Sequence, residues 1–172
     1  MVGYTEVLQT MAAMIIFSMI LLNANRMILR NTVMQVEGEL EQEVVALAQD
    51  IIEEGRTKEF DEVNVGMHLP PAAIPNDFTD PSALGPESGE TKRFEFDDFD
   101  DYNGWIDTLT TEHGQFFIET KVFYVDGTNY EEMSDENTFK KMQVFIKSKF
   151  LLNNQGEKTE YRLEFIRNFY AD

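Results

Sequence analysis

Acidic and aromatic residues alternate over residues 94–107, which read FEFDDFDDYNGWID. Carboxylate and amide oxygens set this close together are the hard ligands that calcium prefers. The candidate ligands are Asp97, Asp98, Asp100, Asp101 and Asn103. In an EF-hand loop, however, Gly104 at the sixth position would place Phe99 at the first, where an oxygen ligand is required. Two interpretations remain: a calcium site, or a tight turn whose Asp and Asn side chains bond backbone groups while the aromatic rings pack.

The sequence contains no arrangement of residues that is typical of a catalytic site. The chain has no cysteine, which excludes a disulfide framework and thiol chemistry. Its two histidines, His68 and His113, do not stand near a candidate nucleophile or at metal-ligand spacing. Phosphate-binding loops, dinucleotide-binding glycine patterns and the helical zinc motif are also absent. We therefore expect a protein that is not an enzyme and has no cofactor, with calcium left open by the Asp-rich stretch.

Charge is distributed unevenly along the 172 residues, which carry a formal net charge of −18. Residues 1–36 hold one acidic residue, Glu6, and two basic residues, Arg26 and Arg30, for a net charge of +1. The rest of the chain therefore carries −19. An acidic surface of this kind repels phosphate groups, so we expect no nucleic-acid partner. It is typical of a well-solvated surface exposed to the medium.

The first element expected to position these residues is a long helix. Residues 7–22, VLQTMAAMIIFSMILL, contain no charged residue. Residues 23–54 continue without a proline and with a single glycine, Gly38, and Gly55 follows as a stop signal. We predict one continuous helix of about 50 residues that is apolar on all sides in its first third. Such a surface needs lipid or protein on every side, although its 16 residues are fewer than the ~20 of a typical membrane span.

Glu6 stands at the start of this apolar run. Two roles are open for its carboxylate. It can lie at a membrane interface, where it stabilises the positive N-terminal end of the helix dipole. It can also pair with a buried cation from a neighbouring chain, which would account for a charge beside an apolar segment.

A second apolar pattern follows along the same helix. Its members are separated by steps of three or four residues, which keeps them on one helix face. They are Leu29, Val33, Val36, Leu40, Val44, Leu47 and Ile51. Acidic residues occupy the opposite face. We expect this stripe to form the helix–sheet contact with the rest of the chain.

The last third of the chain shows the two-residue alternation of half-buried β-strands. We predict strands over residues 116–125, 139–150 and 159–170, which form an antiparallel meander. Turn signals separate them at Asp126-Gly127 and at Asn153–Gly156. The inner face of the second strand is assigned to Met142, Val144, Ile146 and Phe150.

Between helix and strands, residues 55–92 contain all five prolines together with several large apolar residues. We expect an ordered segment that wraps against the helix or the sheet. The domain organisation is then 1–54 for the helix, 55–105 for the Pro-rich wrapping loop and the acidic-aromatic motif, and 106–172 for the antiparallel β head. The expected fold class is α+β: a long N-terminal helix, apolar in its first half and amphipathic in its second, packed on a C-terminal antiparallel sheet.

This order of elements resembles that of the type IV pilins, and three short stretches sharpen the resemblance. The helix end of minor pilins of the mannose-sensitive haemagglutinin pilus, the D-type subunits especially, is similar to ALAQDIIEEGRTKEFDE (46–62). The two segments that follow in those pilins resemble LGPESGE (84–90) and FDDFDDYNGW (96–105), in the same order and with matching spacing. The resemblance covers roughly residues 1–125, and its most specific part is FDDFDDYNGW.

The resemblance implies a pilin-like fold and a structural role. In that family the apolar helix waits in the inner membrane and then enters the core of an extracellular filament, where it packs against identical copies or other pilins. Glu6, fifth when counting starts at Val2, would pair with the N-terminal amine of a neighbour. The other residues expected in the assembly contact are Val7, Leu8, Met11, Met14, Ile15, Phe17, Met19 and Leu22. The alternative is a membrane-tethered surface binding module with calcium at the Asp-rich stretch.

Overall fold

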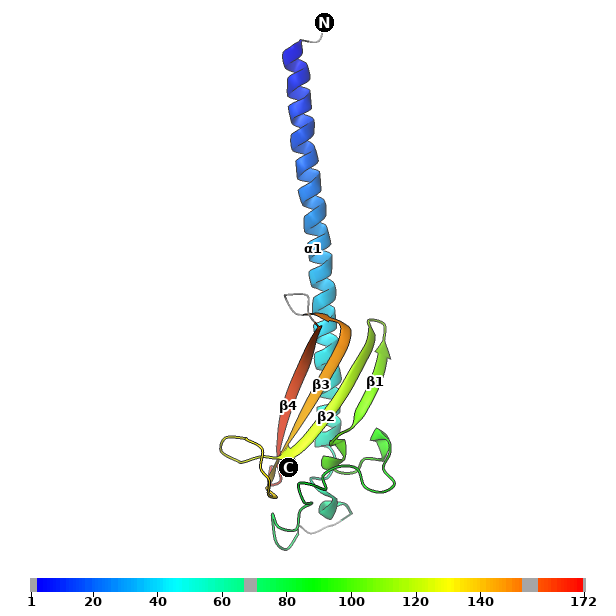
Figure 1. The fold of residues 1–172 in the computed structure, drawn as a ribbon, viewed down its shortest axis with the longest axis vertical. Helices are drawn as coiled ribbons and strands as arrows, with labels where there is room; N and C mark the ends of the chain where they lie inside the picture. Colours follow the sequence, from blue (N-terminus) through cyan, green and yellow to red (C-terminus); the bar gives the residue numbers. More distant parts are fainter. Residues whose placement is uncertain (1–2, 67–70, 153–157, 172) are drawn as a thin grey trace. The chain divides into compact units, whose positions relative to one another are not determined.

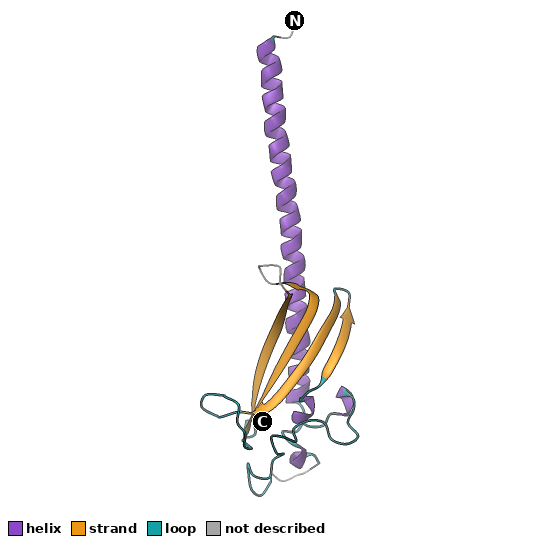
Figure 2. Ribbon diagram, in the orientation of Figure 1, coloured by secondary structure: helices purple, strands orange, loops and turns teal. Residues whose placement is uncertain are grey.

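A computed structural model of the chain describes residues 3–66, 71–152 and 158–171. Its long elements are α1 (Tyr4–Arg56), β1 (Ile106–Thr111), β2 (Gly114–Tyr124), β3 (Phe139–Leu152) and β4 (Lys158–Asn168). Three single-turn 3₁₀ helices, η1 (Glu62–Asn64), η2 (Arg93–Glu95) and η3 (Asp100–Tyr102), lie between α1 and β1 in the sequence. Figure 1 labels these elements and Figure 2 colours them by type. His68 and the predicted turn at Asn153–Gly156 lie outside the described residues.

The chain divides into two compact units, Met1–Glu41 and Gln42–Asp172. The first unit is the N-terminal part of α1. The second unit contains the C-terminal part of α1, the segment with the 3₁₀ helices and the whole sheet. The boundary between the units falls inside α1, whereas the sequence pattern divides the chain where the helix ends.

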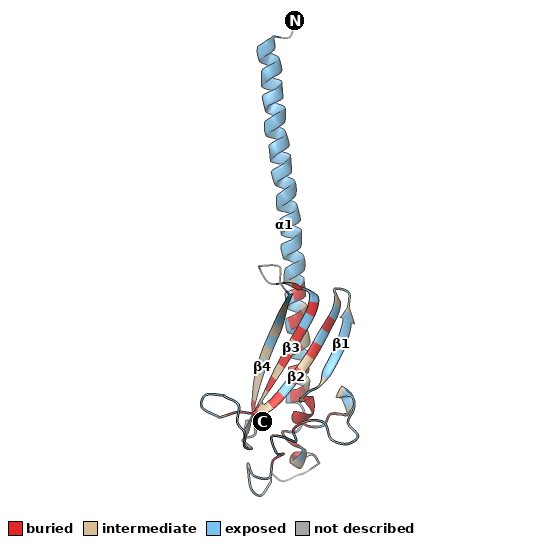
Figure 3. Cartoon of the chain, viewed as in Figure 1, coloured by how far each residue is buried: buried red, intermediate tan, exposed pale blue. Residues whose placement is uncertain are grey.

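Within the second unit, the C-terminal part of α1 packs on the sheet. Val44, Ala48 and Ile51 are buried, at the spacing that places residues on one helix face. Alternate residues of the two central strands are buried as well, as the two-residue period of a strand requires. Figure 3 shows the buried positions along these strands and along this part of the helix. The predicted fold class, α+β with a long helix on an antiparallel sheet, is confirmed.

Gly55 has a different role from the one predicted. It lies inside the last turn of α1, which ends at Arg56, and its backbone is not in the left-handed region. A Cβ at this position would lie 2.8 Å from Met142 Cε and 3.5 Å from the ring of Tyr102. The helix backbone therefore lies close to the Met142 side chain of β3 at this position, and the expectation of a stop signal at Gly55 is wrong.

The sheet has the order β1-β2-β3-β4, and every neighbouring pair is antiparallel. The predicted meander is therefore confirmed, with one strand more than expected. The additional strand, β1, pairs with β2 from Ile106 opposite Glu119 to Thr111 opposite Gly114. Its sequence, IDTLTT, lacks the apolar alternation of a half-buried strand, and five of its six residues are exposed. Backbone pairing along β2, rather than burial of side chains, accounts for this strand.

The end of β3 departs from the predicted alternation. The register with β4 shifts between Lys147 and Leu152. An irregularity of this kind moves the following side chains to the opposite face of the sheet. Phe150 is consequently exposed and Leu151 is buried, so the assignment of Phe150 to the inner face is wrong.

The segment between α1 and β1 packs against the rest of the second unit, as the sequence predicts. Phe60, Phe78 and Leu84 form a buried cluster with Tyr124 of β2. The ring of Phe169 closes this cluster, with its centroid 5.4 Å from that of Phe60 and 5.2 Å from that of Phe78. The wrapping segment therefore shares a core with the sheet.

Two adjacent valines of α1 test the packing of the helix on the sheet. Val44 has no exposed area, so Val44→Asp would bury an unpaired carboxylate, and we expect the free energy of unfolding to fall by ~3 kcal/mol or more. Val45 is 38% exposed, so Val45→Asp should lower it by less than ~1 kcal/mol. Urea denaturation of the detergent-solubilised chain, followed by Trp105 fluorescence, measures both values. Equal losses in the two variants would contradict the assigned helix face.

Candidate functional site

The apolar segment, residues 7–22, is helical and exposed along its whole length. The eight apolar side chains expected to pack during assembly have exposed fractions between 45 and 70%. They are Val7, Leu8, Met11, Met14, Ile15, Phe17, Met19 and Leu22. The helix is long and apolar enough to cross a membrane, and none of its most apolar window is buried. Apolar surface of this extent is unfavourable in water and marks a contact with lipid or protein.

The hydroxyl groups within this segment are satisfied by the helix itself. Thr10 Oγ1 donates to the Val7 carbonyl at 2.8 Å, and Ser18 Oγ donates to the Met14 carbonyl at 2.8 Å. A hydroxyl that bonds a carbonyl of the preceding turn does not need water. The segment can therefore enter an apolar environment without leaving these groups unpaired.

Glu6 lies in the first turn of α1. Its Oε2 accepts a hydrogen bond of 3.2 Å from the Gly3 backbone N–H. This contact satisfies one of the free amide groups at the helix start, and the carboxylate stabilises the positive end of the helix dipole. The helix-terminus part of the first predicted role is thus present within a single chain, and the place of Glu6 at a membrane interface stays a prediction. Pairing with a cation of a neighbouring chain stays a prediction.

The apolar stripe expected to face the sheet divides into two parts. Leu29, Val33 and Val36, which belong to the first unit, are exposed. The later members are covered: Leu40, Val44 and Ile51 are buried and Leu47 is half-buried. The expected burial is therefore absent at the first three positions. The exposed apolar surface of the first unit consequently extends beyond residue 22.

The Asp-rich stretch forms a turn in which carboxylates bond backbone amides. Asp98 Oδ1 accepts from the N–H groups of Asp100 (2.7 Å) and Asp101 (3.1 Å). Asp101 Oδ2 accepts from those of Asp97 (2.8 Å) and Asp98 (3.0 Å). The Asn103 amide donates to the Leu84 carbonyl and accepts from Val122 N–H. These contacts match the tight-turn interpretation.

The five residues proposed as calcium ligands are not brought together as one set. In the described part of the chain, one group of three acidic side chains lies close enough to share an ion. It contains Asp101 from the Asp-rich stretch, together with Glu87 and Glu90 from the preceding loop. Asp97, Asp98 and Asp100 are outside this group.

A buried lysine, which the sequence analysis did not single out, holds the second unit together. Lys140 Nζ donates to the Phe60 carbonyl at 2.8 Å and to Asp61 Oδ2 at 2.7 Å, and it also pairs with Asp100. The side chains of the lysine and both aspartates have no exposed area. The ammonium thus connects β3 to the wrapping segment and to the Asp-rich turn. One signal was readable: two adjacent lysines in a strand, Lys140 and Lys141, must point to opposite faces.

Asp61 carries the largest number of contacts in this network. Thr79 donates to it through both N–H and hydroxyl, and Tyr124 OH donates to its Oδ2 at 3.0 Å. Burial by itself raises the pKa of the Asp61 carboxyl, but the Lys140 ammonium and these hydrogen bonds outweigh it and hold that pKa below its usual range. Asp61 is therefore an ionised partner for Lys140.

In contrast to Asp61, the carboxyl groups of Asp98 and Asp100 have raised pKa values. Burial, and then the neighbouring Asp100 charge, raise the pKa of the Asp98 carboxyl to about 9. Burial also raises the pKa of Asp100, in spite of its ion pair with Lys140. In each carboxyl group Oδ2 is buried without a hydrogen-bond partner in the described chain. A proton on Asp98 would supply a donor to Asp100, so near neutral pH the folded state holds a proton that the unfolded chain releases.

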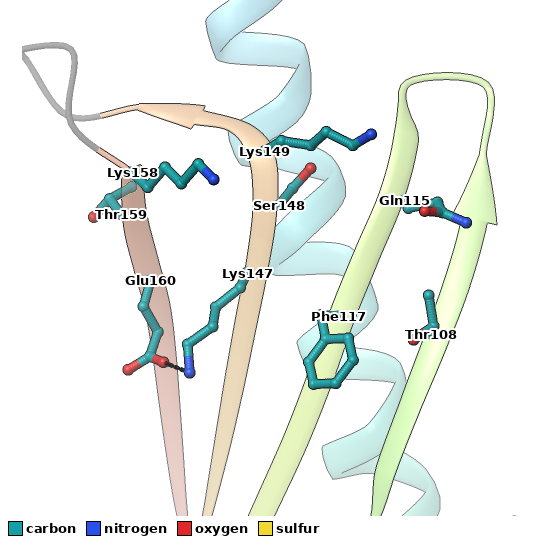
Figure 4. Close-up of a pocket in the computed structure, with 9 residues that line it drawn as sticks. All are labelled: Thr108, Gln115, Phe117, Lys147, Ser148, Lys149, Lys158, Thr159 and Glu160. Atoms are coloured by element: carbon teal, nitrogen blue, oxygen red, sulfur yellow. Dashed lines mark ion pairs between the residues drawn. The ribbon is translucent and has the colours of Figure 1, made fainter.

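A shallow groove of about 550 Å³ lies on the sheet face that carries the exposed residues (Figure 4). Its lining comes from all four strands: Thr108, Gln115, Phe117, Lys147, Ser148, Lys149, Lys158, Thr159 and Glu160. Lys147 pairs with Glu160 at 2.5 Å across β3 and β4. The remaining lysines make this groove a locally basic patch on an acidic unit.

The protonated Asp98 gives the second unit a defined pH dependence. Because its pKa is raised in the folded state, its contribution to stability is complete below pH ~4 and is lost as the pH rises towards ~9. We expect Asp98→Asn, which keeps an acceptor and resembles the protonated form, to flatten the decline in unfolding free energy between pH 6 and 9. The difference in slope should not exceed ~1.4 kcal/mol per pH unit, the limit for one proton. Urea titrations at several pH values measure it.

The matched control for this prediction is Asp107→Asn, at an exposed position of β1. It removes the same formal charge and should leave the slope as in the wild-type chain. A slope that Asp98→Asn does not change would refute the assignment of a bound proton to this carboxyl.

No family model, no curated protein and no solved structure matches the chain. Its own structure is a long N-terminal apolar helix packed on a four-stranded antiparallel sheet, which is a pilin-like architecture. The sequence resemblance is therefore supported at the level of architecture.

Proposed function

We propose that this chain is a structural subunit of an extracellular type IV pilus-like filament, similar to the minor pilins of the mannose-sensitive haemagglutinin pilus. One observation carries the proposal: the apolar segment is a regular helix whose side chains are exposed on every face. A single partner surface covers one face of a helix, whereas a bilayer or a bundle of helices covers all of them. The pilin-like architecture favours the bundle of helices as the environment of the segment after assembly.

Before assembly, the same segment would lie in the inner membrane. The 19 residues between Glu6 and Arg26 carry no charge. As a helix they span about 28 Å, which is close to the ~30 Å hydrocarbon core of a bilayer. Glu6 and Arg26 would then lie near the two interfaces, where charged groups can reach water.

In the filament, the partners of the segment would be the apolar segments of identical copies or of other pilins. Ala12, Ala13 and Ser18 are small enough to permit close approach of helices, and the methionines can adjust their packing. If ~16 side chains each bury half of their apolar area, the gain is on the order of 10 kcal/mol per subunit before ordering costs. An association of this strength supports a stable non-covalent polymer.

Direct imaging tests the proposal. Electron microscopy of material sheared from cells that express the chain should reveal helical fibres with a central bundle of helices. The alternative function, a permanently membrane-tethered binding module, predicts that the chain stays in the membrane fraction and forms no fibres. A monodisperse monomer in detergent-free buffer would contradict both functions, because each requires the apolar segment to be covered.

Glu6 provides a test of the assembly contact. We expect Glu6→Ala to lower the yield of sheared filaments at least ~10-fold, because an unpaired neighbouring amine in an apolar core costs a few kcal/mol. The second unit should keep its near-ultraviolet circular dichroism, since Glu6 lies outside it. Glu37→Ala removes an exposed charge from the same helix and serves as the control. Equal filament yields from the two variants would exclude a pairing role for Glu6.

A further inference from the structure

We propose that Glu87, Glu90 and Asp101 together bind one hard divalent cation, calcium in the first place, which fastens the loop at residues 84–90 to the Asp-rich turn. This inference goes beyond the proposed function and does not depend on filament formation. The carboxylate oxygens that the three residues offer all lie within 4.8 Å of one another. Oxygens around one calcium ion stand 2.3–2.6 Å from it, so pairs of them are separated by at most ~5 Å. The three side chains can therefore reach one ion in their present positions.

Two carboxylate oxygens of the group are buried without a hydrogen-bond partner in the described chain, which favours a bound cation. Asp101 has no exposed area, and its Oδ2 is occupied by the N–H groups of Asp97 and Asp98. Its Oδ1 has no hydrogen-bond partner in the described chain, and neither does the buried Glu87 Oε2. The two carboxyl groups approach within hydrogen-bonding range of each other, although each has only acceptors when ionised. Buried polar atoms are rarely left in this state, and a bound cation would satisfy both.

The charges around the group also favour a cation. Glu62 and Asp97 add two further carboxylates to its surroundings. The nearby basic side chains are engaged elsewhere: Lys58 donates to the Phe96 carbonyl, and Arg93 pairs with Asp50 and Glu54 on α1. The carboxylates at this place therefore outnumber the basic side chains that act on them.

The loop is shaped so that both glutamates face the same point. Glu90 N–H donates to the Glu87 carbonyl at 3.1 Å, and Glu90 Oε2 accepts from Glu87 N–H at 3.3 Å. Gly89 stands between them with a φ of 123°, a conformation that residues with a Cβ rarely adopt. The adjoining Leu84 carbonyl accepts a hydrogen bond of 2.9 Å from the Asn103 side chain. An ion at the group would thus add a second connection between two segments that already touch.

The chemistry of the ligands selects the ion. All three are carboxylates, which are hard oxygen ligands, and no nitrogen or sulfur ligand belongs to the group. Glu87 and Glu90 are partly exposed, so water can complete the six to eight ligands that calcium takes. Magnesium requires a tighter octahedron and binds such sites less readily. Three protein carboxylates with open water positions are typical of extracellular calcium modules, with dissociation constants of about 10⁻⁴–10⁻³ M.

Thermal unfolding of the full chain in non-ionic detergent tests the proposal at pH 7.5 and 0.15 M NaCl. We expect about 5 mM calcium to raise the unfolding temperature by about 5 °C relative to EDTA, because a ligand that binds only the folded state stabilises it. The same concentration of magnesium should raise it by less. Isothermal titration with calcium chloride should give one site per chain.

The informative variant is Glu87→Gln with Glu90→Gln, since both side chains lie on a surface loop and glutamine resembles a protonated glutamate. In EDTA this variant should unfold at or above the wild-type temperature, and calcium should no longer raise it. The control, Glu112→Gln with Glu132→Gln, removes two exposed charges elsewhere and should keep the full calcium shift. A wild-type chain without a calcium shift, or an equal shift in the Glu87/Glu90 variant, would overturn the proposal.

Discussion

The need to cover apolar helix surface governs this molecule. Residues 7–22 form a regular helix whose backbone and hydroxyl groups are satisfied internally, so these groups do not require water. Towards its C-terminal end the sheet covers one face of the same helix, where Val44, Ala48 and Ile51 are buried. The two parts of α1 therefore differ in what covers them. Folding of the chain covers the C-terminal part with the sheet, whereas residues 7–22 need lipid or other protein chains. Under the proposed function, a bilayer and a bundle of helices cover residues 7–22 in turn, without any change in the helix itself.

The second unit depends on a different interaction, the burial of charge. Lys140 connects three separate parts of the chain through the Phe60 carbonyl, Asp61 and Asp100. A buried ammonium is tolerated only when its partners are fixed, and hydrogen bonds from Thr79 and Tyr124 fix Asp61. In its described residues, the segment between α1 and β1 contains no long regular element, so this network and the cluster around Phe60 give it a defined path over the sheet. The acidic composition of the chain thus contributes to its interior as well as to its surface.

The sequence predicted the elements that depend on local patterns. The absence of breakers gave α1, and the alternation of apolar residues gave three of the four strands. β1 was missed because its pairing rests on backbone hydrogen bonds and its side chains are exposed. The burial of Lys140 and the meeting of Glu87 with Asp101 depend on contacts between distant residues that no local pattern encodes. The Asp-rich stretch shows this limit. Its residue types predicted a turn in which carboxylates bond backbone amides, but they did not predict that Asp100 pairs with Lys140 or that Asp101 lies beside Glu87.

Under the proposed function, electrostatic repulsion and burial of apolar surface act against each other when copies of the chain associate. Residues 42–172 carry a formal net charge of −16, so the second units of neighbouring subunits would repel one another wherever they approach within the ~8 Å screening length at physiological ionic strength. Apolar helix packing, on the order of 10 kcal/mol per subunit, has to exceed this repulsion. A divalent ion at Glu87, Glu90 and Asp101 would remove two negative charges from each subunit and would order the loop that carries them. The ion that completes the fold would therefore also weaken the force that opposes assembly, and salt would act in the same direction.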